Sequence, residues 1–186
     1  PTPAPPLSRS DLRGPPVART DLPARLRLRP FRPEDTPTYA AIRARPEVVR
    51  FLPGGEALAA RAAEDAPRLV ARFAAQWEEV GYGPWAVEER ETGRLLGHCG
   101  LRLLPELGGE TEILYLLDST AWGRGLASEG AAAARDYGLG RLGLTRLVAY
   151  VLPENAASVR VLRRIGMREE GPARAFGLDA VRYAIP

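Results

Sequence analysis

The stretch WGRGLASEG, residues 122–130, holds the residues whose types and spacing most clearly predict chemistry. It follows an apolar run, ILYLL at 113–117, and it opens an alanine-rich segment with a helical pattern. Glycines let a backbone approach an anion closely, and the first N–H groups of a helix have no partner within that helix. A strand, a glycine-containing turn and a helix in this order predict a phosphate-binding site.

Two common nucleotide-binding loops do not fit this stretch. A dinucleotide fingerprint needs a third glycine, but Ser128 stands at that position after Gly123 and Gly125. A Walker loop needs a lysine, and all 26 Lys and Arg residues of this chain are arginine. A plain strand-to-helix turn that uses glycines for shape is the alternative that the spacing leaves open.

Glu112 is the candidate general base. On a strand it shares one face with Leu114 and Leu116. A carboxylate between apolar neighbours is partly desolvated, which raises its pKa toward the working range of a base. The alternative is a solvent-exposed and inert Glu112 near the end of the strand.

The segment PENAASVRVLRRIGM, residues 153–167, predicts a capped helix. The Asn155 side chain is placed to accept from the N–H of Ala157 or Ser158, and Gly166 suits a left-handed helix end. Capping and termination explain every position here without a functional role.

His98 and Cys99 are adjacent on a predicted strand, so their side chains face opposite sides and cannot form a catalytic dyad with each other. A buried cysteine and a hydrogen-bonded histidine are expected instead. One histidine and one cysteine also argue against a structural zinc site, and no metal is expected.

The strands and helices that must position these residues are expected in the order β-α-α-β-β-β-α-β-α-β-β along the chain. This order predicts an α/β domain with a mixed sheet. Pro67 is expected to split or kink the second helix. Strands are expected at 25–29, 85–89, 95–104, 110–117, 146–151, 167–170 and 181–185, and helices at 34–44, 56–79, 126–137 and 155–165.

Composition places the chain among single-domain globular proteins. It has 186 residues, 45% hydrophobic and 26% charged, with no apolar run long enough to span a membrane and no signal-peptide pattern. Residues 1–23, rich in proline and arginine, are expected to be a disordered leader before a domain at 24–186. The single cysteine suggests a reducing, cytoplasmic location.

The positive charge is concentrated at the start of the chain. Residues 1–33 hold seven arginines against Asp11 and Asp21, which leaves −2 for the remainder of the net +3. The high pI therefore gives little reason to expect nucleic-acid binding by the folded domain, and no membrane partner is expected.

In combination, these residues resemble the GNAT acetyltransferases, and most closely the RimJ/RimL-like branch that acetylates protein N-termini, including those of ribosomal proteins. The resemblance spans about Arg25 to Pro186. It is carried by RLRLRPFRPED at 25–35, GYGPWAVEERETGRLLGHCGL at 81–101, TEILYLLDSTAWGRGLASEG at 111–130 and ENAASVRVLRRIGMREEG at 154–171.

The resemblance implies one GNAT-like domain with a mixed, mostly antiparallel sheet of about seven strands and about four flanking helices. The strands at 110–117 and 146–151 would splay apart and hold acetyl-CoA between them. The residues implied for acetyl-CoA are Tyr115, Leu116 and Leu117 for pantetheine, Trp122, Gly123, Arg124, Gly125, Leu126, Ala127 and Ser128 around the pyrophosphate, and Asn155 near pantetheine.

The implied reaction is direct acetyl transfer to a primary amine. Glu112 would take the proton of the ammonium, directly or through water, and a backbone N–H near Leu117 would hold the oxyanion. Many relatives have a tyrosine as general acid where this chain has Leu162. Ser158, Tyr150 and Tyr115 are the replacement candidates, and Ser158 is the one placed with Glu112 among the catalytic residues.

The acceptor stays open between a protein N-terminus, a small amine and an aminoglycoside-type antibiotic. The resemblance implies an acceptor site built from residues 46–56 and 171–179. Acids that could attract a cationic amine, or could simply be solvated, are Glu47, Glu56, Glu169, Glu170 and Asp179. A monomer or a homodimer is expected. A non-catalytic acyl-CoA-binding module and a nucleotide binder unrelated to CoA are the alternative functions.

Overall fold

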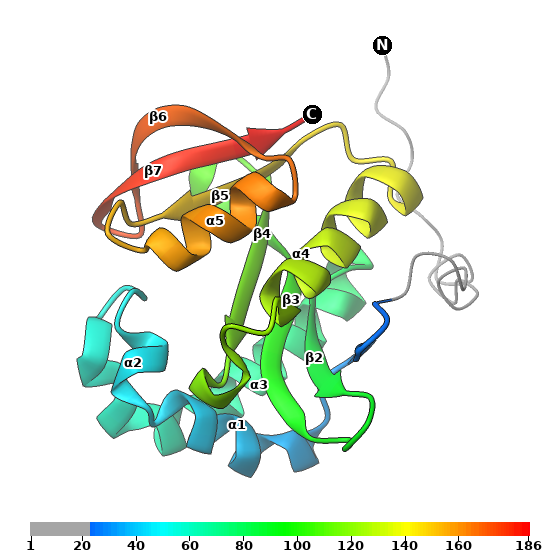
Figure 1. Ribbon diagram of the computed structural model, residues 1–186, viewed down its shortest axis with the longest axis vertical. Helices are drawn as coiled ribbons and strands as arrows, with labels where there is room; N and C mark the ends of the chain where they lie inside the picture. The colour runs from blue at the N-terminus through cyan, green and yellow to red at the C-terminus, as the bar shows by residue number, and fades with distance from the viewer. Residues whose placement is uncertain (1–22) are drawn as a thin grey trace.

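A seven-stranded mixed sheet forms the centre of the computed structural model, which describes residues 23–186 (Figure 1). The predicted leader lies outside the described residues except for Pro23. The strand order is β1-β2-β3-β4-β5-β7-β6, and every neighbouring pair is antiparallel except β4 and β5. The strands are β1 Leu26–Arg29, β2 Pro84–Glu89, β3 Leu95–Leu104, β4 Glu110–Leu117, β5 Leu147–Val151, β6 Arg168–Ala175 and β7 Leu178–Ile185.

The parallel strands β4 and β5 separate almost as soon as they meet. Their register consists of one pair, Glu112 with Val148. In Figure 1 the group β5–β7 with α5 stands above the group β1–β4 with α1–α3. The predicted splay of these two strands and the mostly antiparallel sheet are therefore confirmed.

Five α-helices flank the sheet in the described part of the chain, one more than the four predicted. They are α1 Thr36–Arg43, α2 Pro46–Val49, α3 Ala62–Val80, α4 Leu126–Asp136 and α5 Ala156–Arg164. The additional helix is α2, which begins at Pro46. Proline suits a first helical position, but a single turn is too short to produce a helical period in the sequence.

Pro67 does not split α3, which is assigned as one continuous helix. The change of helical type comes earlier, where the 3₁₀ segment Gly55–Arg61 passes into the α-helix at Ala62. The expected split at Pro67 was wrong, because this sixth residue of α3 removes one hydrogen bond to the Ala63 carbonyl and the helix continues past it.

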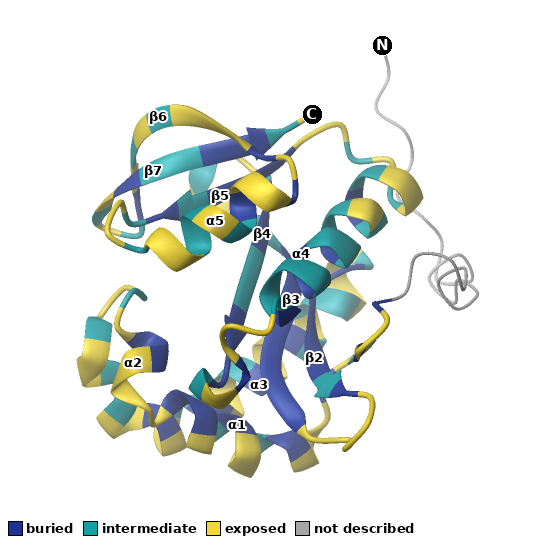
Figure 2. Ribbon diagram, viewed as in Figure 1, coloured by how far each residue is buried: buried dark blue, intermediate teal, exposed yellow. Residues whose placement is uncertain are grey.

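Two hydrophobic cores cover the two faces of the sheet (Figure 2). Successive residues of a strand point to opposite faces, so the side chains of β4 alternate between the two cores. Ile113 and Leu117 pack in the core under α4, whereas Leu116 packs in the core under α1 and α3. Among residues 23–186, no helix is both long and apolar enough to cross a membrane.

Candidate functional site

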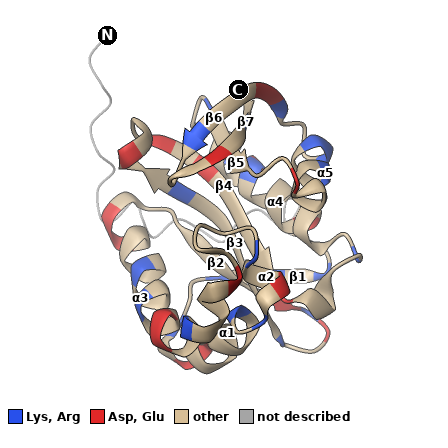
Figure 3. Ribbon diagram, turned by 90° about the vertical axis from the view of Figure 1, so that its left-hand side faces the viewer, with Lys and Arg blue, Asp and Glu red and all other residues tan. Residues whose placement is uncertain are grey.

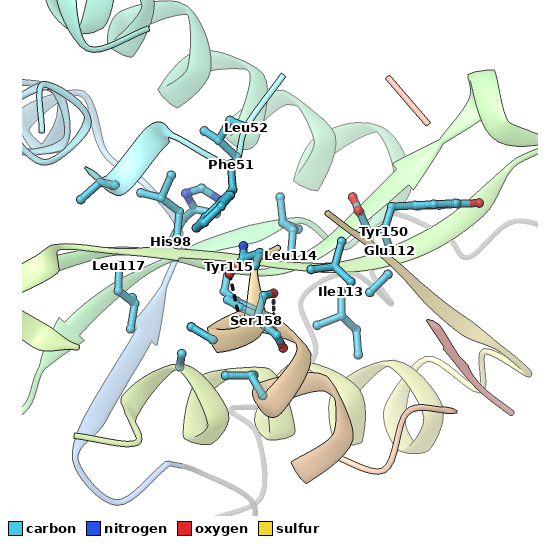
Figure 4. A pocket seen from close by; sticks show the side chains of 18 of the residues that line it. Phe51, Leu52, His98, Glu112, Ile113, Leu114, Tyr115, Leu117, Tyr150 and Ser158 are labelled. Carbon is cyan, nitrogen blue, oxygen red and sulfur yellow. Dashed lines mark hydrogen bonds between the residues drawn. The ribbon is translucent and has the colours of Figure 1, made fainter. Parts of the chain in front are cut away.

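A cavity of about 690 Å³ passes through the gap between β4 and β5. Its walls come from α1–α3 on one face of the sheet and from α4 and α5 on the other. Figure 4 shows Phe51, Leu52 and Glu112 above β4, and Ser158 of α5 below it. One continuous space thus reaches the glycine loop, the gap and the buried glutamate, which the sequence had only suggested separately.

The glycine loop between β4 and α4 presents a row of free N–H groups. Gly123 and Gly125 have φ values of 74° and 77°, in the left-handed region, and α4 begins directly afterwards at Leu126. The N–H groups of residues 123–128 have no hydrogen-bond partner within residues 23–186, whereas that of Glu129 donates to the Gly125 carbonyl at 3.1 Å. Unpartnered N–H groups at a helix start are suited to binding a phosphate.

Arg25, directly before β1, and Glu89 of β2 hold this loop in place. Arg25 donates from Nη1 to the Arg124 carbonyl at 2.8 Å and from Nε to Glu129 at 2.8 Å. Arg124 in turn pairs with Glu89 at 2.6 Å. The loop therefore keeps its shape through ion pairs on its outer side, while its N–H groups remain available.

Trp122 supports the loop through its ring. Its Nε1 donates to the Leu117 carbonyl at 2.9 Å, and the side chain is otherwise half-exposed. This bond ties the start of the loop to the last residue of β4.

Arg160 and Arg164 of α5 line the cavity, and neither has an ion-pair partner among residues 23–186. Neither arginine was among the predicted site residues. Their spacing of four residues places them on one helical face, but the neighbouring Arg163 belongs to the same basic run and pairs with Glu169. Only the position of α5 against the cavity distinguishes these arginines from the others in the chain.

The edge of β4 that faces the gap is set by hydrogen bonding to β3. Asp118 donates its N–H to the Leu96 carbonyl at 2.7 Å. The N–H and C=O groups of successive residues in a strand face opposite neighbouring strands. The main-chain groups of Leu116 therefore face β3, as those of Asp118 do, and those of Tyr115 and Leu117 face β5. Of the three predicted residues, Tyr115 and Leu117 thus present main-chain groups to the gap, while Leu116 does not.

Glu112 lies at the point where β4 and β5 separate. It is 4% exposed, and Arg102 donates from Nε to its Oε2 at 2.9 Å while a second guanidinium nitrogen contacts the same oxygen. The Tyr150 main-chain N–H also favours the charged form of the carboxylate and lowers its pKa. Burial outweighs these contacts and raises the pKa of Glu112, as predicted. Because Arg102 contacts only Oε2, Oε1 is not bonded to the arginine.

Ser158 and Tyr115 meet on the opposite side of the gap. The Tyr115 hydroxyl lies 2.7 Å from Ser158 Oγ, shown as a dashed line in Figure 4. The Asn155 side chain accepts from the Ser158 N–H at 3.1 Å, which confirms the predicted cap. Burial raises the pKa of Tyr115. Serine and tyrosine hydroxyls joined in this way can pass a proton between them.

The other two candidates for a proton donor are placed differently. The Tyr150 hydroxyl donates to Glu110 at 2.6 Å. Leu162, at the position of the tyrosine found in many relatives, is 1% exposed in the core under α4 and α5.

His98 and Cys99 point to opposite faces, as predicted. The Tyr39 hydroxyl bonds to His98 Nδ1 at 2.8 Å, and burial lowers the pKa of His98 to about 3. Burial raises the pKa of the Cys99 thiol to about 12. His98 is therefore neutral and Cys99 is an un-ionised thiol at neutral pH.

Most of the five acids named above as candidates for attracting a cationic amine do not face the cavity. Only Glu47 lines it, and that side chain accepts from Ser119 Oγ at 2.8 Å. Figure 3 shows acidic and basic positions interspersed along the ribbon. The remaining acids with ion-pair partners are Glu169 with Arg163, Glu170 with Arg146 and Arg182, and Asp179 with Arg174. Within residues 23–186, no cluster of His, Cys, Asp and Glu has the arrangement of a metal site.

Comparison with known proteins adds to this geometry. A family model described as an acetyltransferase (GNAT) domain matches residues 25–168. The uncharacterized N-acetyltransferase YoaA of Bacillus subtilis (strain 168) is 33% identical over 161 residues, covering 87% of this chain and 88% of that protein. An acetyltransferase from Agrobacterium tumefaciens str. C58 superposes with a TM-score of 0.73 at 30% identity, covering 88% of this chain and 91% of the other.

A further solved structure is Mycobacterium smegmatis RimJ, in complex with CoA-disulfide. It superposes with a TM-score of 0.72 at 25% identity and covers 88% of this chain and 83% of that chain.

Proposed function

This chain belongs to the GNAT family of N-acetyltransferases, and we propose that it transfers the acetyl group of acetyl-CoA directly to a primary amine. The observation that carries the proposal is the continuous cavity that leads from the glycine loop through the β4–β5 gap to the buried Glu112. The six N–H groups of residues 123–128 have no partner among residues 23–186. A phosphate site and a general base at the two ends of one space are what this transfer requires.

Acetyl-CoA would bind along the α4 and α5 side of the cavity. The N–H groups of residues 123–128, with the Ser128 hydroxyl, would bind the pyrophosphate, and Trp122 would support the loop. Arg160 and Arg164 would add positive charge for the phosphates. The main-chain groups of Tyr115 and Leu117 would pair with pantetheine, and Asn155 would lie beside it.

Catalysis would begin with a proton moving from the ammonium to Glu112, directly or through water. The free amine then attacks the thioester carbonyl, forming a C–N bond, and a main-chain N–H at the end of β4 stabilises the oxyanion. As the C–S bond breaks, the Ser158 hydroxyl, hydrogen-bonded to Tyr115, would protonate the CoA thiolate. The second proton that the nitrogen loses restores the Ser158 hydroxyl through solvent, and Glu112 releases the first proton to solvent, so the products are the amide, CoA thiol and one proton.

A thiol-release assay with thermal denaturation tests this function. CoA at about 100 times its dissociation constant should add about 2.7 kcal/mol to the free energy of unfolding, and hence raise Tm by roughly 5–10 °C. Acetyl-CoA with a suitable amine should release thiol. Binding of CoA without release across peptides, polyamines and aminoglycosides would instead indicate an acyl-CoA-binding module. Stabilisation by ATP or NAD but not by CoA would indicate a different nucleotide ligand.

Ser158→Ala is expected to lower kcat by about 10²-fold, the lower end of the range for general acid–base groups, because the Tyr115 hydroxyl remains nearby. The measurement is steady-state thiol release at saturating amine. Ser158→Thr, which keeps a hydroxyl, is the matched control and should retain most of the rate. Tyr115→Phe combined with Ser158→Ala should cost less than the sum of the two single effects. An unchanged kcat in Ser158→Ala would remove Ser158 from the mechanism.

A further inference from the structure

The backbone of Phe176 adopts a left-handed conformation that is unusual for a residue with a large side chain. Its φ is 53°, and within residues 23–186 it is the one non-glycine residue with positive φ. With Gly177, at φ 78°, it forms the two-residue turn between β6 and β7. Two-residue hairpin turns with both central φ values positive favour Asn-Gly, and a side chain in this region costs about 1–2 kcal/mol. Such strain persists where the surroundings require the residue.

The Phe176 ring lies over the ion pair of the candidate base. The Arg102 guanidinium carbon is 4.7 Å from the ring centroid, and Arg102 is the partner of Glu112. Tyr150 meets the same ring edge-on, with centroids 6.3 Å apart and an angle of 87°. The strained turn therefore holds an aromatic side chain against the cavity wall beside Glu112.

Apart from Arg102 and Tyr150, the cavity lining beside Phe176 is apolar. The hairpin adds Ala175, Leu178 and Ala180 to the lining. From the other side of the same face, Phe51 and Leu52 point into the space, as Figure 4 shows. The tip of the β6–β7 hairpin and the α2 region thus form two apolar walls on the acceptor face of β4.

The charges on this face do not favour a polycation. Within residues 23–186, the acids that line the cavity are Glu47 and Glu112, and they are bonded to Ser119 and Arg102 respectively. Arg43 and Arg72 also line this space, and neither has an ion-pair partner in the described part of the chain. Arg43 is buried, with an Nε that makes no hydrogen bond. A second positive charge on the acceptor would meet Arg43 and Arg72 as well as the Glu47 carboxylate, so the charges on this face give a polycation no net attraction.

We propose that the acceptor is a primary amine whose neighbouring substituent is apolar, and that Phe176 is the specificity-determining residue that contacts this substituent. The inference rests on the proposed acetyl transfer and defines its acceptor. The apolar group lies between Phe176 and the wall of Phe51 and Leu52, while the nitrogen faces Glu112. A peptide N-terminus and a small free amine both provide this chemistry.

The test is kcat/KM for thiol release with four acceptors: a Phe-initiated peptide, the matching Ser-initiated peptide, 2-phenylethylamine and spermidine. The wild-type protein should favour the Phe peptide or 2-phenylethylamine over the other two by about 10–200-fold, the discrimination that an apolar pocket provides. Preference between the two apolar acceptors identifies the source. A wild-type preference for spermidine or the Ser peptide would overturn the proposal.

The decisive variant is Phe176→Asn, because asparagine suits the left-handed turn but lacks the ring. Tm should stay the same or rise, KM for acetyl-CoA should be unchanged, and the preference for apolar acceptors should fall at least tenfold. Asp179→Asn, an exposed substitution in the same hairpin, is the control and should keep the wild-type preference. Phe176→Leu should retain part of the preference because it keeps an apolar side chain.

The possible failures are distinguishable. Thiol release with an unchanged preference in Phe176→Asn overturns the role of Phe176 alone. Absence of thiol release by the wild-type protein with every amine overturns the proposed function, and the acceptor assignment with it. A Tm loss of several degrees in Phe176→Asn would contradict the assignment of strain to the Phe176 backbone.

Discussion

Glu112→Gln is expected to lower kcat by about 10²–10⁴-fold while leaving the affinity for acetyl-CoA nearly unchanged. Glutamine has the same size and keeps an oxygen that can accept from Arg102, so the wall of the cavity should keep its shape. It cannot take a proton from an ammonium. The measurement is kcat from thiol release, together with the CoA dissociation constant by calorimetry.

The pH dependence of the wild-type enzyme provides a second measurement. Burial raises the pKa of Glu112 above its ordinary value of 4.5 despite the Arg102 partner. A base acts in its deprotonated form, so kcat should fall as the pH drops through the raised pKa. This acidic limb should be absent from whatever activity remains in Glu112→Gln.

The raised pKa of Glu112 affects folding stability and kcat in opposite directions as the pH rises: kcat increases, whereas the contribution of Glu112 to stability decreases. A carboxyl group with a raised pKa in the folded state favours folding when protonated. That contribution is complete below pH 4.5 and is lost as the pH rises through the raised pKa of the folded state.

Glu110→Gln is the matched control for Glu112→Gln. Glu110 lies two residues earlier on the same face of β4, pairs with Arg182 and accepts from the Tyr150 hydroxyl, but does not line the cavity. This variant should keep most of the wild-type kcat. Equal turnover in Glu112→Gln and wild type would exclude Glu112 as the base, and equal losses in both variants would point to a general disturbance of β4.

Gly97→Ala is expected to lower the free energy of unfolding by about 3 kcal/mol or more, and Tm by roughly 6–12 °C. Gly97 lies on β3 opposite Leu117 and has a φ of 142°. A methyl group there would lie 2.0 Å from the Leu116 carbonyl oxygen, so the backbones of β3 and β4 would have to move apart. Because the end of β4 borders the gap, CoA affinity should fall as well. Urea denaturation with and without CoA measures both effects.

Gly140→Ala is the control for this substitution. A methyl group at Gly140 would meet no atom within 4 Å. Its stability should be unchanged or slightly higher, since alanine is the better helix former. A Gly97→Ala protein as stable as Gly140→Ala would show that the β3–β4 pair adapts to the added carbon at little cost.

Much of the fold follows from local patterns in the sequence. The strands at 95–104 and 110–117 agree with β3 and β4, and Asn155 caps α5 as expected, because alternation and capping involve neighbouring residues only. The closing strands were predicted too short, at 167–170 and 181–185, whereas β6 and β7 span Arg168–Ala175 and Leu178–Ile185. The sequence of β6 is polar and lacks an alternating apolar pattern, so most of the strand was not predicted. Main-chain pairing with β7 stabilises it.

The donor side of the site was largely determined by the sequence alone. The glycines, the helix start and the preceding strand are contiguous in the chain, so their spacing was enough to predict a phosphate-binding turn at 122–130. The buried Glu112 could be predicted for the same reason, since its apolar neighbours lie two residues apart on one strand. These features depend on backbone geometry over short distances.

The acceptor side was decided only by the tertiary structure. Arg102 reaches Glu112 from β3, and the Phe176 ring reaches Arg102 from the turn between β6 and β7. Arg160 and Arg164 reach the cavity from α5. None of these contacts leaves a periodic signal, because each joins segments that are distant in the sequence. Packing between such segments sets burial and charge pairing, and therefore determines both the pKa of Glu112 and the shape of the cavity around it.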